Sequence, residues 1–295
     1  MKLSGDHTQR FAQRWLLTTS TNCAVDMVSL VTLLLAWLLL ARRIHIPPFG
    51  HAWMATQCLQ ITVQIVLCRR GASPAWRELG AATFRLNSFG MGAANAITKL
   101  WLDQTACQTG RLALARHAML MLLSSGAGTL LLIQAKAMRL SLALAVQLFV
   151  VLMCMQTNST MCSGAALTRP LAQQQTHQLF QLLELASFSP LPVAAKVQPA
   201  TECAAVLGYL QLSIGLVLPL LAQAALESSL FQEHQQQRRQ CGVRPESGYM
   251  QWVFDAIGSL GEALDRVTFP AALWMLLGLL WKLSVVIAYR QAEGG

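Results

Sequence analysis

The chain has 295 residues, of which 54% are hydrophobic and only 12% are charged. A typical water-soluble domain carries about 25% charged residues, because its surface needs groups that water solvates well. This composition does not fit a water-soluble fold and predicts a surface that faces a lipid bilayer. The net charge of +9 comes from single or paired basic residues beside apolar runs, so we expect anionic lipid headgroups, and not a nucleic acid, as the partner.

We expect six or seven helices to cross the membrane, since a span needs about 20 apolar residues and must satisfy its own backbone hydrogen bonds. Six apolar segments are predicted spans: residues 25–41, 52–68, 118–135, 140–156, 203–226 and 267–289. A seventh segment, 86–102, has small residues that suit helix packing, but also Asn87, Asn95 and Lys99, which make insertion costly. The predicted fold is an all-α, polytopic transmembrane helical bundle with interfacial amphipathic helices.

The spans divide the chain into regions of different polarity. The predicted regions are a polar and amphipathic N-terminal segment 1–24, a membrane region 25–156 with four or five spans, a loop 157–202, a span 203–226, a loop 227–266 that begins polar and becomes amphipathic, a span 267–289 and a tail 290–295. Within the loops, helical periodicity predicts two surface amphipathic helices, at 173–188 and 250–267. Gly208, Gly215 and Pro219 are expected to kink the span at 203–226.

The orientation of the bundle is tested by charge, by a glycosylation sequon and by two cysteines. The distribution of Lys and Arg favours a cytosolic N-terminus for six spans and for seven. The sequon at Asn158 lies beyond the membrane on the side away from the cytosol only in the seven-span version. Cys162 and Cys203 flank the loop 157–202 and would form a disulfide if that loop faced an oxidising compartment, but we expect free thiols.

Three glutamines share one face of the predicted span 52–68. Gln57, Gln60 and Gln64 are spaced at i, i+3 and i+7, and amides in hydrocarbon are costly unless they are paired. The functional interpretation is a polar track that lines a substrate path. The simpler interpretation, which we favour, is hydrogen bonding between helices, with Gln147, Gln211 and Ser124 as candidate partners.

Lys282 is the charge that lies well inside a predicted span, and it is the fourth candidate residue of the substrate path. We expect its long side chain to snorkel toward the membrane surface near Tyr289. The alternative is an ion pair or a coupling charge in a cavity. The sequence offers no carboxylate in the middle of a span to receive it, which argues against a proton-coupled carrier.

Enzyme signatures do not occur in the sequence. It has no H-E-x-x-H zinc motif, no G-x-S-x-G elbow and no Walker lysine, so we expect no catalytic residue, metal or cofactor and no enzymatic activity. The leading hypothesis is a small-solute transporter or a channel-like protein in a membrane. The alternative is a non-catalytic membrane scaffold or sensor whose amphipathic loops bind lipid or a partner, and a membrane enzyme comes third.

Overall fold

The computed structural model describes residues 20–43, 46, 48–70, 74–90, 113–127, 138, 140–187, 198–240, 259 and 268–293. Every regular element within these residues is a helix, so the all-α prediction is confirmed for this part of the chain. The helices are α2 (Ser20–Arg43), α3 (Pro48–Arg69), α4 (Pro74–Gly90), α6 (Ala113–Ser124), α8 (Leu140–Gln156), α9 (Asn158–Cys162), α10 (Pro170–Ala186), α11 (Pro199–Leu210), the π-helix η1 (Gln211–Val217), α12 (Leu218–Gln240) and α14 (Thr268–Glu293).

Prolines fix where several helices start. Pro48, Pro74, Pro170 and Pro199 are each the first residue of a helix, where the fixed φ of proline fits and its missing N–H is not needed. Because of Pro74, the helix that includes Leu86 starts well before the predicted segment 86–102, and it ends at Gly90. The rest of that segment, most of the predicted amphipathic helix 250–267 and the chain before residue 20 lie outside the described residues.

The predicted span 118–135 does not form one continuous helix. α6 begins at Ala113 and ends at Ser124, and Gly126 has a φ of 73°. Ser124 and Ser125 donate their hydroxyls to the carbonyls of Met121 and Leu122, three residues earlier. Short polar side chains that bind nearby backbone and a glycine in the left-handed region both favour a helix end. Apolar composition alone therefore overestimated the length of this helix.

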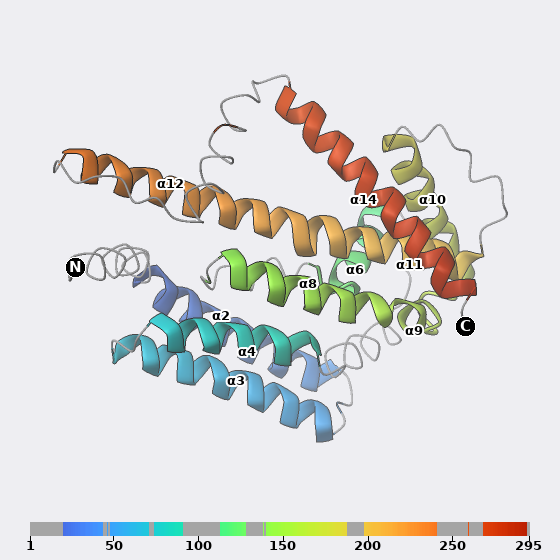
Figure 1. Cartoon of the computed structure of the whole chain (residues 1–295). Coiled ribbons are helices and arrows are strands. Elements are labelled where there is room, and N and C mark those ends of the chain that lie inside the picture. Colours follow the sequence, from blue (N-terminus) through green and yellow to red (C-terminus); the bar gives the residue numbers. More distant parts are fainter. Residues whose placement is uncertain are drawn as a thin grey trace.

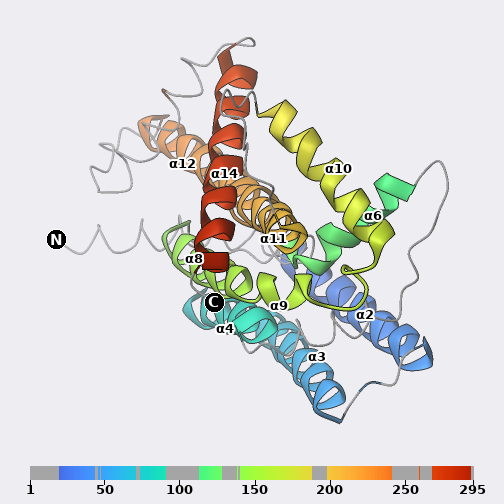
Figure 2. The ribbon, with the colours of Figure 1, turned by 90° about the vertical axis from the view of Figure 1, so that its right-hand side faces the viewer.

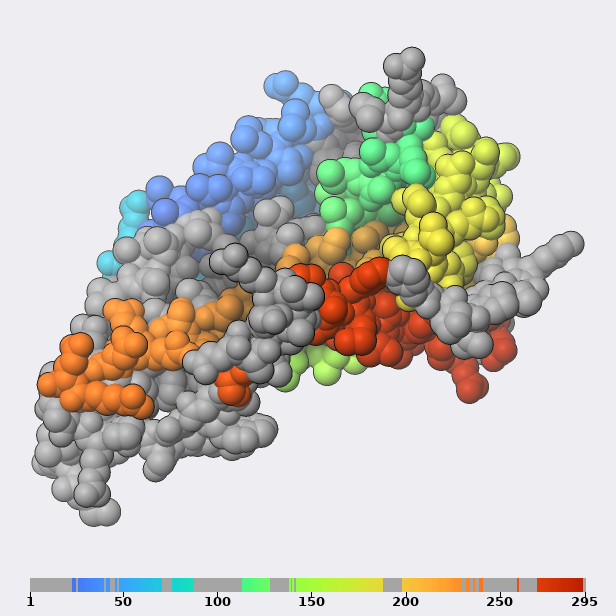
Figure 3. All heavy atoms as spheres, turned by 90° about the horizontal axis from the view of Figure 1, so that it is seen from above, coloured from blue at the N-terminus to red at the C-terminus, as the bar shows by residue number. Residues whose placement is uncertain are grey.

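The long helices form a bundle with a common direction (Figure 1). α2, α4 and α8 run one way along it, and α3 and the continuous helix α11–η1–α12 run back. α14 crosses over α11, and Figure 2 shows the crossing from the end of the bundle. Seen from above in Figure 3, α10 lies between α14 and α6. The segment 157–202 is therefore packed against the bundle through α10.

Two apolar clusters hold these helices together. One joins α6, α9, α10, α11 and α14, and contains Met121, Phe180, Leu207 and Trp281 among its buried members. The other joins α4, α8 and η1, with Ala81, Val150 and Leu212 among its buried members. Small residues such as Ala81, Ala82 and Ala143 let α4 and α8 approach closely. The π-helix η1 thus lies where the two clusters meet.

Large apolar side chains are exposed along whole helix faces. The exposed residues of α2 include Met27, Val28, Val31, Leu34, Leu35, Leu38 and Leu39. Those of α14 include Met275, Leu279, Leu283 and Val286, which recur at helical spacing on one face. Water-soluble monomers rarely expose contiguous apolar patches larger than a few hundred Å². These faces are therefore expected to contact lipid or another apolar surface and not water.

Among the described residues, two helical stretches are long and apolar enough to cross a membrane, Pro199–Ser229 and Pro270–Glu293. Asp26–Leu39, Ala113–Ser124 and Leu142–Gln156 are apolar but shorter. The structure therefore supports membrane association through two helices, while the predicted six or seven spans go beyond it. The helix α12 begins inside the predicted span 203–226 and continues to Gln240, so the polar start of the predicted loop 227–266 is helical.

The contact between α11 and α14 is expected to dominate the stability of the bundle. Leu207 is fully buried between these helices, so we expect Leu207→Ala to lower the free energy of unfolding by about 2–5 kcal/mol in detergent. Leu185→Ala is the matched control, because Leu185 on α10 is 76% exposed and its truncation leaves no cavity. Equal thermal shifts for the two variants would contradict this packing.

Candidate functional site

The longest apolar helix changes to a π-helical turn in its middle, and a side chain from another helix binds the backbone there. Pro219 has no N–H, so the carbonyl of Gly215, four residues earlier, cannot receive the ordinary helical hydrogen bond. The chain widens into the π-helix Gln211–Val217, and the N–H of Leu218 donates to the carbonyl of Ser213, five residues back. The amide of Gln147, on α8, donates to the carbonyl of Gly215. Near the predicted kink at Gly215 and Pro219, the structure thus has a π-helical turn in a continuous helix, while Gly208 lies in the regular helix α11.

Gln147 also receives a charged donor from the other side. Arg85, on α4, donates from Nη1 to Oε1 of Gln147 over 3.4 Å. Arg85 is 1% exposed and Gln147 is fully buried, so both polar groups lie deep in the bundle. A guanidinium keeps its charge at any physiological pH. Gln147 therefore links a buried positive charge to the opened turn of η1.

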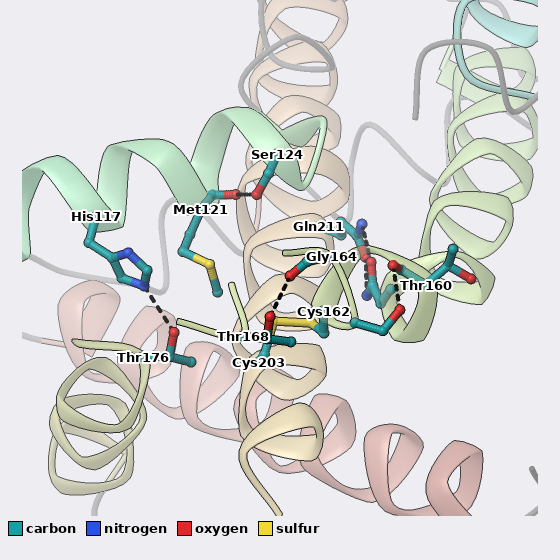
Figure 4. The surroundings of a disulfide bond; sticks show 12 residues. His117, Met121, Ser124, Thr160, Cys162, Gly164, Thr168, Thr176, Cys203 and Gln211 are labelled. Atoms are coloured by element: carbon teal, nitrogen blue, oxygen red, sulfur yellow. Dashed lines mark hydrogen bonds between the residues drawn. A yellow bond between two sulfur atoms is a disulfide. The ribbon is translucent and has the colours of Figure 1, made fainter. Parts of the chain in front are cut away.

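A second glutamine anchors the beginning of the π-helix. Gln211 and Asn158 exchange two side-chain hydrogen bonds of 2.9 Å, and Gln211 also donates to the carbonyl of Ser125 over 3.0 Å. Figure 4 shows Gln211 close to the disulfide and to the turn after α6. Asn158 is buried and its amide is engaged, so the sequon at Asn158 is not accessible in the folded chain. Polar side chains from η1, α9 and the end of α6 meet at this point.

The predicted glutamine stripe faces α4. Gln57 and Gln64 are buried, and Gln60 accepts a hydrogen bond of 3.2 Å from Asn87 of α4. The side-chain amide of Gln64 packs directly against Gly80 of α4, where a larger residue would require the Gln64 side chain to move. The structure therefore places Gln60 and Gln64 against α4. Gln60 takes part in a hydrogen bond between helices, and the substrate path along the stripe stays a prediction.

The suggested partners of the stripe bind elsewhere. Gln147 contacts Arg85 and Gly215, and Gln211 contacts Asn158 and the residue after Ser124. Sequence reasoning named these two glutamines only as candidate partners of the stripe, and it overlooked Arg85. The signal that was available for Arg85 is the spacing of Glu78, Ala81, Ala82 and Arg85, which places them on one helical face that the structure buries.

Lys282 does not join the glutamine stripe, and the prediction that it snorkels is wrong. Its Nζ lies 3.0 Å from Oε2 and 3.1 Å from Oε1 of Glu184, on α10. The indole of the neighbouring Trp281 donates to the same carboxylate over 2.9 Å. Glu184 was overlooked because it lies in the loop between predicted spans. The alternative interpretation, an ion pair, is the one that the structure bears out.

α10 is held in place by polar contacts from several helices. Trp274 of α14 donates to the carbonyl of Ala186, and Thr176 is 2.9 Å from Nε2 of His117, on α6. Nδ1 of His177 lies 2.8 Å from Oε1 of Glu202, in the first turn of α11. The helix differs from the predicted surface helix at 173–188, since it buries Gln175 and Thr176 and exposes leucines.

Cys162 and Cys203 form a disulfide, so the prediction of free thiols is wrong. The bond joins the end of α9 to the first turns of α11, across a sequence separation of 41 residues, with the two Cα atoms 5.8 Å apart. Figure 4 shows it beside the contact between His117 and Thr176. The pairing could not be derived from the sequence, because it depends on which helices become neighbours in the folded chain.

The remaining chemistry of the described residues is limited. No group of three or more His, Cys, Asp or Glu side chains in this part of the chain could hold a metal ion. No protein-family model, curated protein or solved structure matches the chain. The argument about function therefore depends on the polar contacts around η1 and on the apolar surface.

The exchange of hydrogen bonds between Gln211 and Asn158 is expected to be cooperative. We expect Gln211→Leu to destabilise the protein by about 1–3 kcal/mol, because Asn158 loses its partner while it remains buried. The double variant Gln211→Leu/Asn158→Leu should cost less than the sum of the two single variants. Gln178→Leu, at an exposed position of α10, is the control. Strict additivity in thermal unfolding would show that the pair is not coupled.

The ion pair between Lys282 and Glu184 should couple α14 to α10. In a double-mutant cycle with Lys282→Ala and Glu184→Ala, we expect a coupling energy on the order of 1 kcal/mol, since both side chains are partly shielded from water. Hydrogen exchange of the α10 amides is the second readout, and it should rise in either single variant. Arg290→Ala, which removes an exposed charge from the same helix, should leave α10 protected.

Proposed function

We propose that this chain is a multi-pass integral membrane protein that moves a small polar solute across the bilayer. The apolar faces of α2, α3, α8 and α14 support the membrane part of this proposal, because they leave large side chains exposed over several helices. The common direction of the long helices supports it as well, since parallel and antiparallel helices of similar depth can share one bilayer (Figure 1). On this proposal, the shorter apolar helices cross the membrane together with the two long ones.

The observation that carries the transport proposal is the opened turn at Gly215 and Pro219. Membrane transporters often bind their solutes where a spanning helix is interrupted and its backbone carbonyls are free to bind. Here Gln147 donates to such a carbonyl, and Arg85 lies behind it. A π-helical turn is frequently found at functional sites, because it costs stability that packing alone would not select. A solute with hydrogen-bonding groups can replace the Gln147 contact at this point.

The second candidate, a membrane scaffold or sensor, is favoured by one different observation. α10 exposes Leu182 and Leu185 although it lies outside the long bundle helices. An exposed leucine pair on a docked helix suits a contact with lipid or with a partner. The same helix is tied to α6, α11 and α14, so it presents these leucines on a rigid support.

The decisive experiment is cysteine labelling with a water-soluble maleimide in intact membranes. The starting chain keeps only Cys162 and Cys203, and single cysteines are introduced as Gln60→Cys and Leu59→Cys. Gln60 faces α4, whereas Leu59 is the exposed neighbour on the same helix. We expect labelling at position 60, reduced by a transported solute, and none at position 59, which faces lipid.

The other outcomes of this experiment are equally informative. Rapid labelling at both positions would overturn the membrane assignment, because an exposed side chain in water reacts freely. Labelling at neither position would overturn the hydrated path and leave the scaffold function ahead. Labelling at position 59 alone would show that Leu59, and not Gln60, lies on the side of α3 that water reaches.

A further inference from the structure

The disulfide marks one end of the helical bundle. Cys162 ends α9 and Cys203 lies in the first turns of α11, so both are at the end of the bundle where α11 begins. The C-terminal half of α14 reaches the same end, because Trp281, Val285 and Ala288 pack in one cluster with Cys203 and Leu207. Figure 2 shows this end, with α9, α11 and the end of α14 grouped together.

Arginines lie at both ends of the bundle, with Arg42 and Arg43 at the end of α2 and Arg290 near the end of α14 on the disulfide side, and a larger group at the opposite end. α3 ends at Arg69, the exposed Arg70 follows it, and Arg77 lies at the start of α4. α12 ends at Gln240, just after Arg238 and Arg239. The directions of the helices in Figure 1 place these ends together with the start of α2, away from the disulfide. Segments rich in Lys and Arg face the cytosol in multi-pass membrane proteins.

From these two observations we infer the orientation of the chain: the disulfide end faces an oxidising compartment, and the start of α2 and the end of α12 face the cytosol. The inference depends on the multi-pass proposal above. Forming the disulfide removes two electrons and two protons from two thiols, and an oxidised dithiol partner of the compartment accepts them by thiol–disulfide exchange. Cytosolic thiols are kept reduced, so the disulfide end belongs on the side away from the cytosol. The larger group of arginines at the opposite end agrees with a cytosolic location of that end.

This orientation decides the number of crossings that charge alone left open. α2 starts on the cytosolic side and α14 ends on the oxidising side, so the number of crossings is odd. The seven-span version has this property.

The orientation also determines which parts of the candidate site face outward. α10, with its contacts to Lys282 and Glu202, lies on the oxidising side, where it covers the beginning of α11. Gln211 and Asn158 are nearer to that side than the turn at Pro219, since α11 starts there. A solute that enters from outside would therefore meet the Gln211 pair before it meets Gln147.

The test is a glycosylation assay of the full chain translated into microsomes. Thr160→Ala first removes the native sequon, whose Asn158 is buried. An acceptor sequon on a flexible spacer is then added either before Met1 or after Gly295. We expect glycosylation of the C-terminal acceptor and none of the N-terminal acceptor. Modification of the N-terminal acceptor, of both or of neither would overturn the orientation.

A membrane extraction separates this inference from the function on which it rests. If alkaline carbonate releases the chain from the microsomes, the membrane proposal itself fails. If the chain stays in the membrane but carries the wrong glycosylation pattern, only the orientation fails. In a chain that keeps only Cys162 and Cys203, a mass-tagged maleimide added after denaturation should react with neither cysteine before reduction and with both after it. Reaction before reduction would also overturn the inference.

Discussion

The arrangement of this protein depends on one backbone group, the carbonyl of Gly215, which Pro219 cannot bind. A helix in an apolar surround has no water to satisfy such a group, so another donor must be supplied from within the bundle. Gln147 of α8 supplies it, and this places α8 against the opened turn of η1. Arg85 then binds the other end of the same amide, which brings α4 to α8. One missing backbone hydrogen bond thus explains why three segments far apart in the sequence meet.

α4 connects this polar centre to the N-terminal helices. One part of it faces α8 through Arg85, and another faces α3 through Gly80 and Asn87. The absence of a side chain at Gly80 lets the amide of Gln64 pack against α4, and a larger residue there would displace the Gln64 side chain. The glutamine stripe and the opened turn therefore lie on two sides of the same helix, and a change in the position of α4 would affect both.

At the other end, α10 is fastened by contacts of different chemical kinds. The disulfide fixes the end of α9 to α11. On α10, Glu184 forms an ion pair with Lys282 of α14, and His177 contacts the carboxylate of Glu202 on α11. Covalent and ionic contacts respond to different conditions, so reduction and salt would loosen different parts of this segment. The segment is consequently a fixed part of the bundle, although its sequence resembles a surface loop with an amphipathic helix.

The sequence by itself predicted the helical class and the apolar composition of the long helices, and it indicated an irregular helix near Pro219. These properties are local, since they follow from composition, proline geometry and the periodicity of apolar residues. Only the tertiary structure decided that Lys282 pairs with Glu184 and that Cys162 bonds to Cys203. It also decided that Gln147 binds η1 and that Gln211 binds Asn158 of α9, and that neither binds the glutamine stripe. Such pairings depend on which helices become neighbours, and a single sequence carries no periodic signal for contacts between distant segments.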